Sequence, residues 1–396
     1  MRPAPAEHKG GRFALRVSLL FAAIFLSVGI TLPYLPLWLD WVGLSAREIA
    51  IITAAPLLAR TLAAPAIAYG ADRAGAHRRL LIALAWAGFA VLIALAEARR
   101  FAAILPLSVL FSIAWTGVLP LTETIAMRGV KASGLAYGHM RLWGSLSFIG
   151  ASLFGGWALA GLGPGYVLWL LSAAAALTAA AAHALPRCSP RASGVARLGP
   201  LAGVVPLIFA RDFLLFLVAA GSVQAAHAVL YAFSTLHWRA LGLSTTSAGA
   251  LWAISIVAEV ALFACARSVV RHIGAARLIV LGATAAVIRW AAMGFDPPLL
   301  LLVALQALHG LTFAATHLGA MHFIARTVSD ALAATAQALY AAATSGIFMA
   351  VAILGAGPLY AAYAGRAYWA MAAMATVGMA AALVLVATDS RPAPAG

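Results

Sequence analysis

The stretch YGADRAGAHRRL, from Tyr69 to Leu80, is a short polar link between two long apolar segments. Glycine adopts backbone conformations that other residues avoid, so Gly70 and Gly75 predict tight turns within this link. The Asp72 carboxylate can lie near a helix N-terminus or pair with an arginine of a neighbouring helix. The stretch therefore predicts a sharp connection between two helices, held by acidic and basic side chains.

The composition of the whole chain excludes several classes of protein. Of the 396 residues, 64% are apolar and 9% are charged, and the mean hydropathy is +0.99. A soluble globular domain has about 25% charged residues and about 45–50% apolar residues. A soluble enzyme, a nucleic-acid-binding protein and a disordered protein are therefore excluded. We expect an all-α polytopic membrane protein whose partners are the lipid bilayer and a small molecule.

The apolar runs predict twelve transmembrane helices, each with a span of about 20 residues. In the first half we expect helices at Phe13–Leu39, Glu48–Gly70, Arg79–Ala96, Ala102–Met127, Gly134–Leu162 and Pro164–Leu185. In the second half we expect them at Leu207–Trp238, Thr246–Val269, Leu278–Met293, Leu299–Ala325, Ala331–Gly355 and Tyr363–Val386. Between the halves, the polar and breaker-rich residues 186–203 indicate a linker. The expected domains are a six-helix bundle over residues 1–185, this linker, and a second bundle over residues 204–396.

The basic residues predict the orientation. Of the 26 Lys and Arg residues, most lie in links on the side of the N-terminus. The opposite side holds only Arg47, Arg99, Arg100, Arg239 and Arg366. Positive charge collects on the cytoplasmic side of membrane proteins. Both termini are therefore expected in the cytoplasm, the linker is expected to be cytoplasmic, and the net charge of +15 belongs to cytoplasmic loops in the cell inner membrane.

The two halves carry traces of an internal repeat. The sequence Gly-Leu-Ser occurs at Gly43–Ser45 and again at Gly242–Ser244, an offset of 199 residues. The same offset aligns Gly75 with Gly274 in the next links. Parallel repeats of this kind are one way in which transporters are built. We therefore expect the two six-helix bundles to be related by pseudo-two-fold symmetry.

The link after the second helix resembles the cytoplasmic signature of the major facilitator superfamily. That signature has Gly, Asp-Arg, Gly and paired basic residues after the second helix. The resemblance implies twelve helices and a loop that acts as a latch on one side of an alternating-access cycle. The residues that match the signature, and so form the expected gating loop, are Gly70, Asp72, Arg73, Gly75 and Arg78.

Three further stretches resemble a narrower branch, the phenylpropionate permease-like group, which is related to lactose permease and other oligosaccharide–proton symporters. They are LPYLPLWL at Leu32–Leu39, YGHMRLWGSLSFIG at Tyr137–Gly150 and LHGLTFAATHLGAMHFI at Leu308–Ile324. The general resemblance covers essentially the whole chain, whereas the branch rests on these three segments.

Charged side chains inside the expected helices mark candidate functional residues. An ionised group at the bilayer centre costs at least about 2.5–3.5 kcal/mol. Such groups therefore face a polar cavity or one another. They either form a transport site or are structural pairs that orient helices. The five clear cases are Arg60, Glu123, Arg141, Glu259 and Arg289.

Glu123 and Arg141 are the leading candidates for substrate binding. They lie on consecutive antiparallel helices, and a carboxylate beside a guanidinium can form a bidentate pair that opens for substrate. The resemblance to lactose permease implies that both residues contact the substrate. Arg60 adds a buried cation, which suits an anionic substrate. Trp38 and Trp143 can stack on an aromatic substrate, or can be packing and interfacial anchors.

Candidates for proton coupling lie mainly in the second half. The resemblance implies that Arg289 and His309 belong to the coupling machinery. One turn after His309, however, Thr312 stands where the relatives have a proton-carrying acid. The carrier is then expected to be Glu259, Glu123 or a histidine such as His309 or His322, because histidine titrates near neutral pH.

Three other histidines, His317, His139 and His227, carry less weight. Any of these histidines can also be a packed side chain that donates to a backbone carbonyl.

These observations favour a secondary active transporter that moves a small organic solute by alternating access. An aromatic or other monocarboxylate is the favoured substrate, and proton symport is the favoured coupling. A sugar or nucleoside symporter, a drug-type exporter and a non-transporting receptor remain alternatives. No HExxH, GxSxG or P-loop motif occurs, so we expect no enzyme. Cys188 and Cys265 lack metal-site spacing, so no metal or cofactor is expected. We expect no nucleic-acid partner and a functional monomer.

Overall fold

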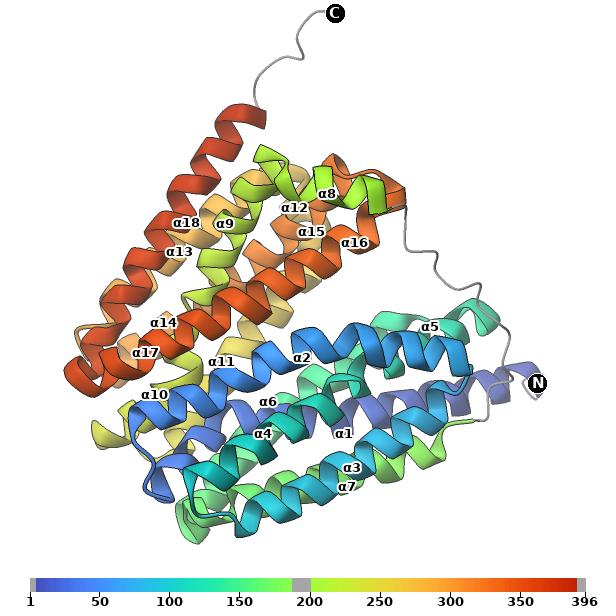
Figure 1. The fold of residues 1–396 in the computed structure, drawn as a ribbon, viewed down its shortest axis with the longest axis horizontal. Helices are drawn as coiled ribbons and strands as arrows, with labels where there is room; N and C mark the ends of the chain where they lie inside the picture. Colours follow the sequence, from blue (N-terminus) through green and yellow to red (C-terminus); the bar gives the residue numbers. More distant parts are fainter. Residues whose placement is uncertain (1–4, 187–200, 390–396) are drawn as a thin grey trace, which may run out of the picture. The chain divides into compact units, whose positions relative to one another are not determined.

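The computed structural model describes residues 5–186 and 201–389, and all the secondary structure in these ranges is helical (Figure 1). The apolar segments become helices because a helix satisfies its backbone hydrogen bonds within itself, as a chain in lipid requires. The first six spans consist of α1 (Pro5–Trp41), α2 (Ala46–Ala74), α3 (His77–Glu97), α4 (Phe101–Thr116) with α5 (Val118–Ser133), α6 (Tyr137–Leu162), and η1 (Pro164–Tyr166) with α7 (Val167–Ala184).

The second half begins with α8 (Leu201–Phe209) and contains several interrupted spans. Its first three spans are α9 (Arg211–Ala225) with α10 (Ala228–Ala240), α11 (Thr245–Ala264) with the short α12 (Ala266–Ile273), and the uninterrupted α13 (Ala275–Met293). The fourth and fifth spans each contain a π-helix: α14 (Leu299–Ala307) with η2 (Gly310–Ala315) and α15 (Thr316–Thr327), and α16 (Asp330–Ala341) with η3 (Ala342–Phe348) and α17 (Met349–Tyr363). The last span is η4 (Ala364–Arg366) with α18 (Ala367–Asp389). The irregular segments make this half less regular than the sequence predicted.

Eleven segments of the described chain are long and apolar enough to span a membrane. The last of them, Asp330–Thr388, has 59 residues, whereas a bilayer core of about 30 Å needs only about 20. This segment turns at η4, where Ala364 has a positive φ of 48°. It therefore supplies two crossings, and the predicted twelve-helix, two-bundle fold is confirmed.

The structure separates into two compact units. Among the described residues, the first holds residues 5–186 together with Trp238–Ala253, and the second holds residues 201–237 and 254–389. The unit boundary thus divides α11, which the sequence assigned wholly to the second bundle. Most of the predicted linker, residues 187–200, lies outside the described residues.

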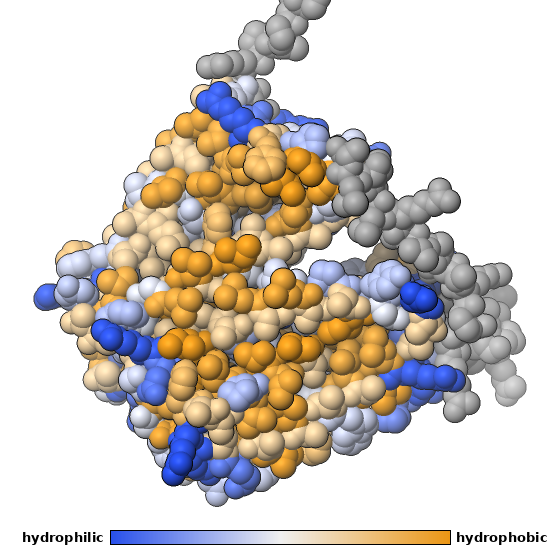
Figure 2. Space-filling view, viewed as in Figure 1, coloured by the Kyte–Doolittle hydropathy of each residue, from blue (hydrophilic) through white to orange (hydrophobic). Residues whose placement is uncertain are grey.

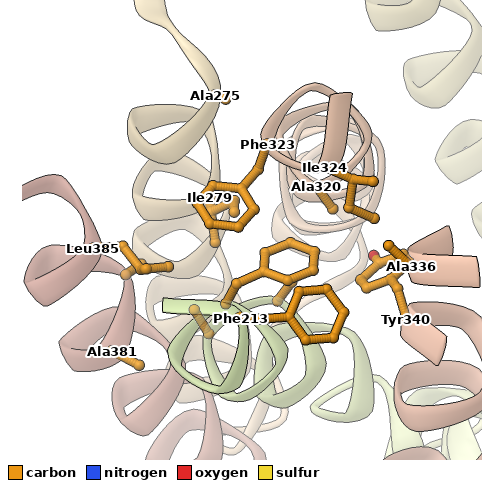
Figure 3. Close-up of a cluster of buried hydrophobic side chains, with 14 residues drawn as sticks. Phe213, Ala275, Ile279, Ala320, Phe323, Ile324, Ala336, Tyr340, Ala381 and Leu385 are labelled. Atoms are coloured by element: carbon orange, nitrogen blue, oxygen red, sulfur yellow. The ribbon is translucent and has the colours of Figure 1, made fainter. Parts of the chain in front are cut away.

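Aromatic stacking anchors the core of the second unit (Figure 3). The ring of Phe216, on α9, stacks on Phe323 at 4.6 Å and on Tyr340 at 5.4 Å between centroids. These three residues come from different spans, so their contact joins α9, α15 and α16.

The surface also has the character of a membrane protein. Figure 2 shows a face on which apolar side chains predominate, with the most hydrophilic groups mainly near its edges. Large apolar side chains such as Leu62 and Leu300 are more than four-fifths exposed, at 81% and 83%. Exposed apolar surface on this scale marks a site of membrane or protein contact. Together with the spans, it identifies a multi-pass membrane protein.

The repeat seen in the sequence recurs in the backbone. Gly43 and Gly242 have nearly the same positive φ, 91° and 88°. Each glycine N–H donates to the carbonyl three residues earlier, at 2.8 and 3.0 Å. The serine two residues after each glycine then accepts a hydrogen bond at a helix start, as Ser45 does for α2 and Ser244 for α11. The same turn-and-cap geometry is thus used twice.

The predicted topology can be tested by cysteine labelling in a Cys188→Ser/Cys265→Ser background. We expect Arg239→Cys and Arg366→Cys, both at exposed positions, to react with an impermeant thiol reagent added outside the cell. Arg73→Cys is the matched control, because its exposed position should react only after the membrane is opened. Protection of both external positions in a correctly inserted protein would contradict the assigned orientation.

Candidate functional site

The link between α2 and α3 turns at Gly75. Gly75 caps α2 in the left-handed conformation, with φ 58° and ψ 16°, and its N–H donates to the Asp72 carbonyl at 3.2 Å. The predicted turn at Gly70 is wrong, because this residue lies inside α2. Only Gly75 therefore forms the turn that was predicted for both glycines.

The charged residues of this link form a small network. Oδ1 of Asp72 lies 2.9 Å from Nε2 of His77 at the start of α3. The guanidinium of Arg128, from α5, approaches the same imidazole at 3.4 and 3.5 Å. Arg73 lies 3.5 Å from the Tyr69 hydroxyl within α2. The acidic residue of the signature is thus held by a histidine that the sequence analysis did not single out.

Arg78 connects this link to the end of α7. Its Nε donates to the Leu185 carbonyl at 2.8 Å, and its Nη2 donates to the His183 carbonyl at 2.7 Å. These carbonyls end a helix, where no helical donor is available to them. Arg78 therefore ties the start of α3 to the end of α7.

In the first unit, Arg141 of α6 lies in an aromatic setting. Its guanidinium carbon is 4.1 Å from the ring centroid of Phe25 and 5.8 Å from that of Phe21, both on α1. Gly144 leaves room for this arrangement, since a Cβ there would lie 2.8 Å from Nη1 of Arg141 and 2.9 Å from the Phe25 ring. The cation is thus held over aromatic faces, which is a favourable geometry.

Glu123 is half-buried on α5, and its charge interacts with Arg141. Its Oε1 is 3.5 Å from the Tyr137 hydroxyl. Across the described residues, no ion pair of 4.0 Å or less joins Glu123 to Arg141, so the predicted bidentate pair is not formed in this structure. The physical reason is that the guanidinium lies over Phe25 instead.

The other predicted substrate residues are placed differently. Trp38 is 1% exposed and belongs to the packed core, which favours the packing role left open for it. Trp143 is 55% exposed on α6, and Arg60 is half-buried on α2. The structure thus brings Arg141 and Glu123 together but shows no stacking role for these two tryptophans.

In the second unit, the fully buried Arg289 of α13 lies at the centre of a polar cluster. Its Nη1 lies 3.1 Å from Nδ1 of His309 and 3.0 Å from the hydroxyl oxygen of Thr312. Its Nη2 donates to Oε1 of Gln306. The Trp290 ring lies beside the guanidinium carbon, at 4.5 Å from centroid to carbon. The buried cation is therefore held by neutral acceptors and an aromatic ring.

His309 extends this cluster toward α11. Its Nε2 lies 3.9 Å from Oε2 of Glu259, so the structure brings Glu259, His309 and Arg289, three of the candidates for proton coupling, together in the second unit. His322 does not join them: it is exposed, and its Nδ1 donates to the Leu318 carbonyl at 2.9 Å. His322 thus has the alternative role of a histidine satisfied by its own helix.

His227 is a member of the cluster to which the sequence analysis gave little weight. It is fully buried between α9 and α10, and its Nε2 lies 3.0 Å from the Thr312 hydroxyl. The signal that could have found it is its position, since an ionisable residue in the middle of an apolar span is functional by default. Over residues 5–186 and 201–389, no three His, Cys, Asp or Glu side chains are grouped as metal ligands.

Comparisons with known proteins agree with this fold. A model of the "MFS_1 like family" matches residues 14–371. A protein of Escherichia coli (strain K12), described as a "Probable 3-phenylpropionic acid transporter", is 31% identical over 92% of this chain and 95% of its own length. The "Maltose permease" of Geobacillus stearothermophilus is 29% identical over 83% of each chain.

Solved structures show the same fold at lower identity. The nucleoside transporter NupG has a TM-score of 0.80 and 17% identity, covering 96% of this chain and all of that one. A D-xylose-proton symporter has a TM-score of 0.71 and 15% identity, covering 94% and 97% of the two chains. The chain therefore belongs to the MFS_1-like family and is a membrane transporter of the major facilitator superfamily, not an enzyme.

Proposed function

We propose that this protein carries a small organic monocarboxylate, with an aromatic acid favoured, across the cell inner membrane by alternating access with proton symport. Both termini lie in the cytoplasm and the protein acts as a monomer in this proposal. The observation that carries the substrate class is Arg141. It is half-buried over Phe25, and within the described part of the chain no carboxylate pairs with it.

The chemistry of this position suits an aryl carboxylate. A guanidinium binds a carboxylate through two parallel hydrogen bonds, which gives both strength and orientation. Phe21 and Phe25 can contact an aromatic ring by edge-to-face or offset packing, worth about 0.5–1.5 kcal/mol per pair. Glu123 interacts with the same guanidinium, so a substrate carboxylate competes with it. That competition gives the site a means of releasing the substrate.

The relatives support this class of substrate without deciding it. The Escherichia coli relative is described as a phenylpropionic acid transporter, whereas other similar proteins are described as maltose and nucleoside transporters. A sugar or nucleoside can also accept hydrogen bonds from a guanidinium, whereas a carboxylate in addition neutralises its charge, so the Arg141 position favours the acid.

Matched substrate analogues test this proposal in proteoliposomes. We expect uptake of 3-phenylpropionate, and a loss of about 100-fold with the uncharged amide, because two charge-assisted hydrogen bonds are worth about 3 kcal/mol. The cyclohexyl analogue, which keeps the carboxylate, should bind about three- to tenfold more weakly. Maltose and uridine serve as controls for the alternative substrates. Equal uptake of the acid and the amide would reject an anionic substrate.

Proton coupling is proposed to involve Glu259 and His309, which lie 3.9 Å apart. A Glu259→Gln protein is fixed in the neutral, proton-loaded form of this side chain. It should bind substrate and exchange it across the membrane, yet fail to accumulate it against a gradient. Measured accumulation under an imposed pH gradient, compared with counterflow, separates these steps. Wild-type uptake that ignores the pH gradient would instead indicate facilitated diffusion or another coupling ion.

A further inference from the structure

Hydrogen-bond directions can be assigned along the chain of side chains that joins His227 to Arg289. Nδ1 of His227 lies 3.0 Å from the Gln224 carbonyl oxygen and 3.2 Å from that of Val223. A carbonyl oxygen can only accept, so Nδ1 carries the proton. Nε2 of this neutral ring is then an acceptor, and the Thr312 hydroxyl, 3.0 Å away, donates to it.

This direction leaves a lone pair of the Thr312 oxygen for Arg289. Nη1 of Arg289 donates to that oxygen at 3.0 Å. A competing acceptor for the Thr312 hydroxyl proton, the His309 carbonyl, lies farther away at 3.5 Å. His227 is therefore the nearer acceptor for the hydroxyl proton, and it anchors the Thr312 oxygen in the place where that oxygen accepts from Arg289.

The second hydrogen of Nη1 fixes the tautomer of His309. Nη1 lies 3.1 Å from Nδ1 of His309, and a guanidinium can only donate. Nδ1 is therefore the acceptor, and the ring proton is on Nε2, which faces Glu259 at 3.9 Å. A protonated His309 would need a hydrogen on Nδ1, where Arg289 already points one. Proton uptake by His309 and its bond to Arg289 thus exclude each other.

We propose that His227, acting through Thr312, is a positioning residue that holds Arg289 on Nδ1 of His309 and so keeps His309 neutral until that bond opens. The transport consequence rests on the proton coupling proposed above. The backbone supports this role, because His227 lies at the break between α9 and α10 while Thr312 lies in the π-helix η2. One side-chain bond therefore joins two irregular segments, and such segments often occur at functional sites.

Other titratable groups surround the two histidines, and the experiment must separate their effects from that of Thr312. Tyr231 of α10 stacks on His227 at 5.6 Å, and Glu259 of α11 faces His309. Tyr368 of α18 stacks on Trp290, and His317 of α15 stacks on Phe313, which itself stacks on His309. Since Glu259 is the carboxylate of this set, each measurement is repeated in Glu259→Gln to separate its charge from the effect of Thr312.

Nitrogen NMR of the full-length protein in nanodiscs, with labelled histidine, tests the assignment directly. His227→Gln and His309→Gln identify the two sets of signals. We expect the Nδ1–H tautomer at His227 and the Nε2–H tautomer at His309. In Thr312→Val, which removes the hydroxyl at nearly constant shape, the pH at which His309 takes up a proton should rise by about one unit, a tenfold change in proton affinity. Thr312→Ser, the matched control, should leave it unchanged.

His227→Phe supplies an independent variant, because it keeps a ring but removes the acceptor. It should shift the His309 titration as Thr312→Val does, and the double variant should show no further shift, since both changes break one connection. Additive shifts, an unchanged titration in Thr312→Val, or an Nδ1–H proton on wild-type His309 would overturn the proposal.

Transport measurements add the functional consequence. In proteoliposomes, Thr312→Val should shift the pH dependence of the proton-driven initial uptake rate upward by about one unit, matching its change in proton affinity, while counterflow stays near wild type. A proportional loss of uptake and counterflow without this shift would indicate a purely structural role and would count against the proposal. If the wild type ignores the pH gradient, proton coupling fails, and the NMR result still decides the role of His227.

Discussion

Arg289→Ala is expected to abolish accumulation of substrate and to destabilise the protein by at least about 3 kcal/mol, at about 1–3 kcal/mol for each of three buried acceptors left unsatisfied. Arg289 is fully buried, and its removal leaves the acceptors on Gln306, His309 and Thr312 without their donor. Buried polar groups that lose their partner bear the full cost of desolvation. Thermal unfolding in detergent and uptake into proteoliposomes measure the two effects.

Arg289→Lys separates charge from geometry at the same position. A lysine keeps the positive charge, but its compact ammonium lacks the planar fork that reaches three acceptors on α14, η2 and the segment between them. We therefore expect accumulation to be lost in Arg289→Lys as well, with a smaller loss of stability. Arg271→Ala, at an exposed position on α12, is the matched control and should change stability by less than about 0.5 kcal/mol. Full accumulation by Arg289→Lys would show that charge alone suffices.

Arg141→Ala is expected to reduce uptake of 3-phenylpropionate by about 100-fold while leaving the amount of protein in the membrane largely unchanged. The expected loss corresponds to two charge-assisted hydrogen bonds, about 3 kcal/mol together. Stability should change little, because the Arg141 side chain is half-buried and no ion pair holds it among the described residues. Initial uptake rates and a binding measurement on purified protein provide the test.

Three companion variants sharpen this experiment. Arg141→Lys keeps the charge without the fork and should lose about tenfold, about half of the binding free energy of the pair. Glu123→Gln should impair transport rather than binding, because it removes the carboxylate that competes with the substrate for the same guanidinium and so slows release. Gly144→Val should displace the Arg141 side chain, since a Cβ at this position would lie 2.8 Å from its Nη1. Wild-type affinity in Arg141→Ala would mean that the residue is structural and that substrate binds elsewhere.

Features that depend on local composition could be predicted from the sequence alone. Apolar runs of sufficient length must form helices in lipid, because only then are their backbone groups satisfied. For the same reason, the twelve crossings and the polar links between them followed from residue order. The recurrence of Gly-Leu-Ser at Gly43 and Gly242 was also visible in the sequence, and the structure gives both glycines a positive φ.

The pairing of side chains was decided only by the tertiary structure, because it depends on how each helix is rotated. One additional residue in a helix turns the face that follows by about 100°. The π-helix η2 lies between His309 and His322, which is consistent with His309 facing the buried cluster while His322 is exposed. The break beside His227 likewise turns this side chain toward Thr312, a contact that no spacing in the sequence indicates.

The site in the first unit shows the same limit. The sequence placed Glu123 and Arg141 on consecutive antiparallel helices, and the structure brings their charges within reach of one another. The sequence alone could not show that Arg141 would lie over Phe25, a residue of α1 that is remote in the chain. Hydropathy and helix capping depend on the order of a few neighbouring residues, so the sequence alone predicts them. The partner of a charged side chain is chosen by packing among distant helices, which only the folded chain brings together.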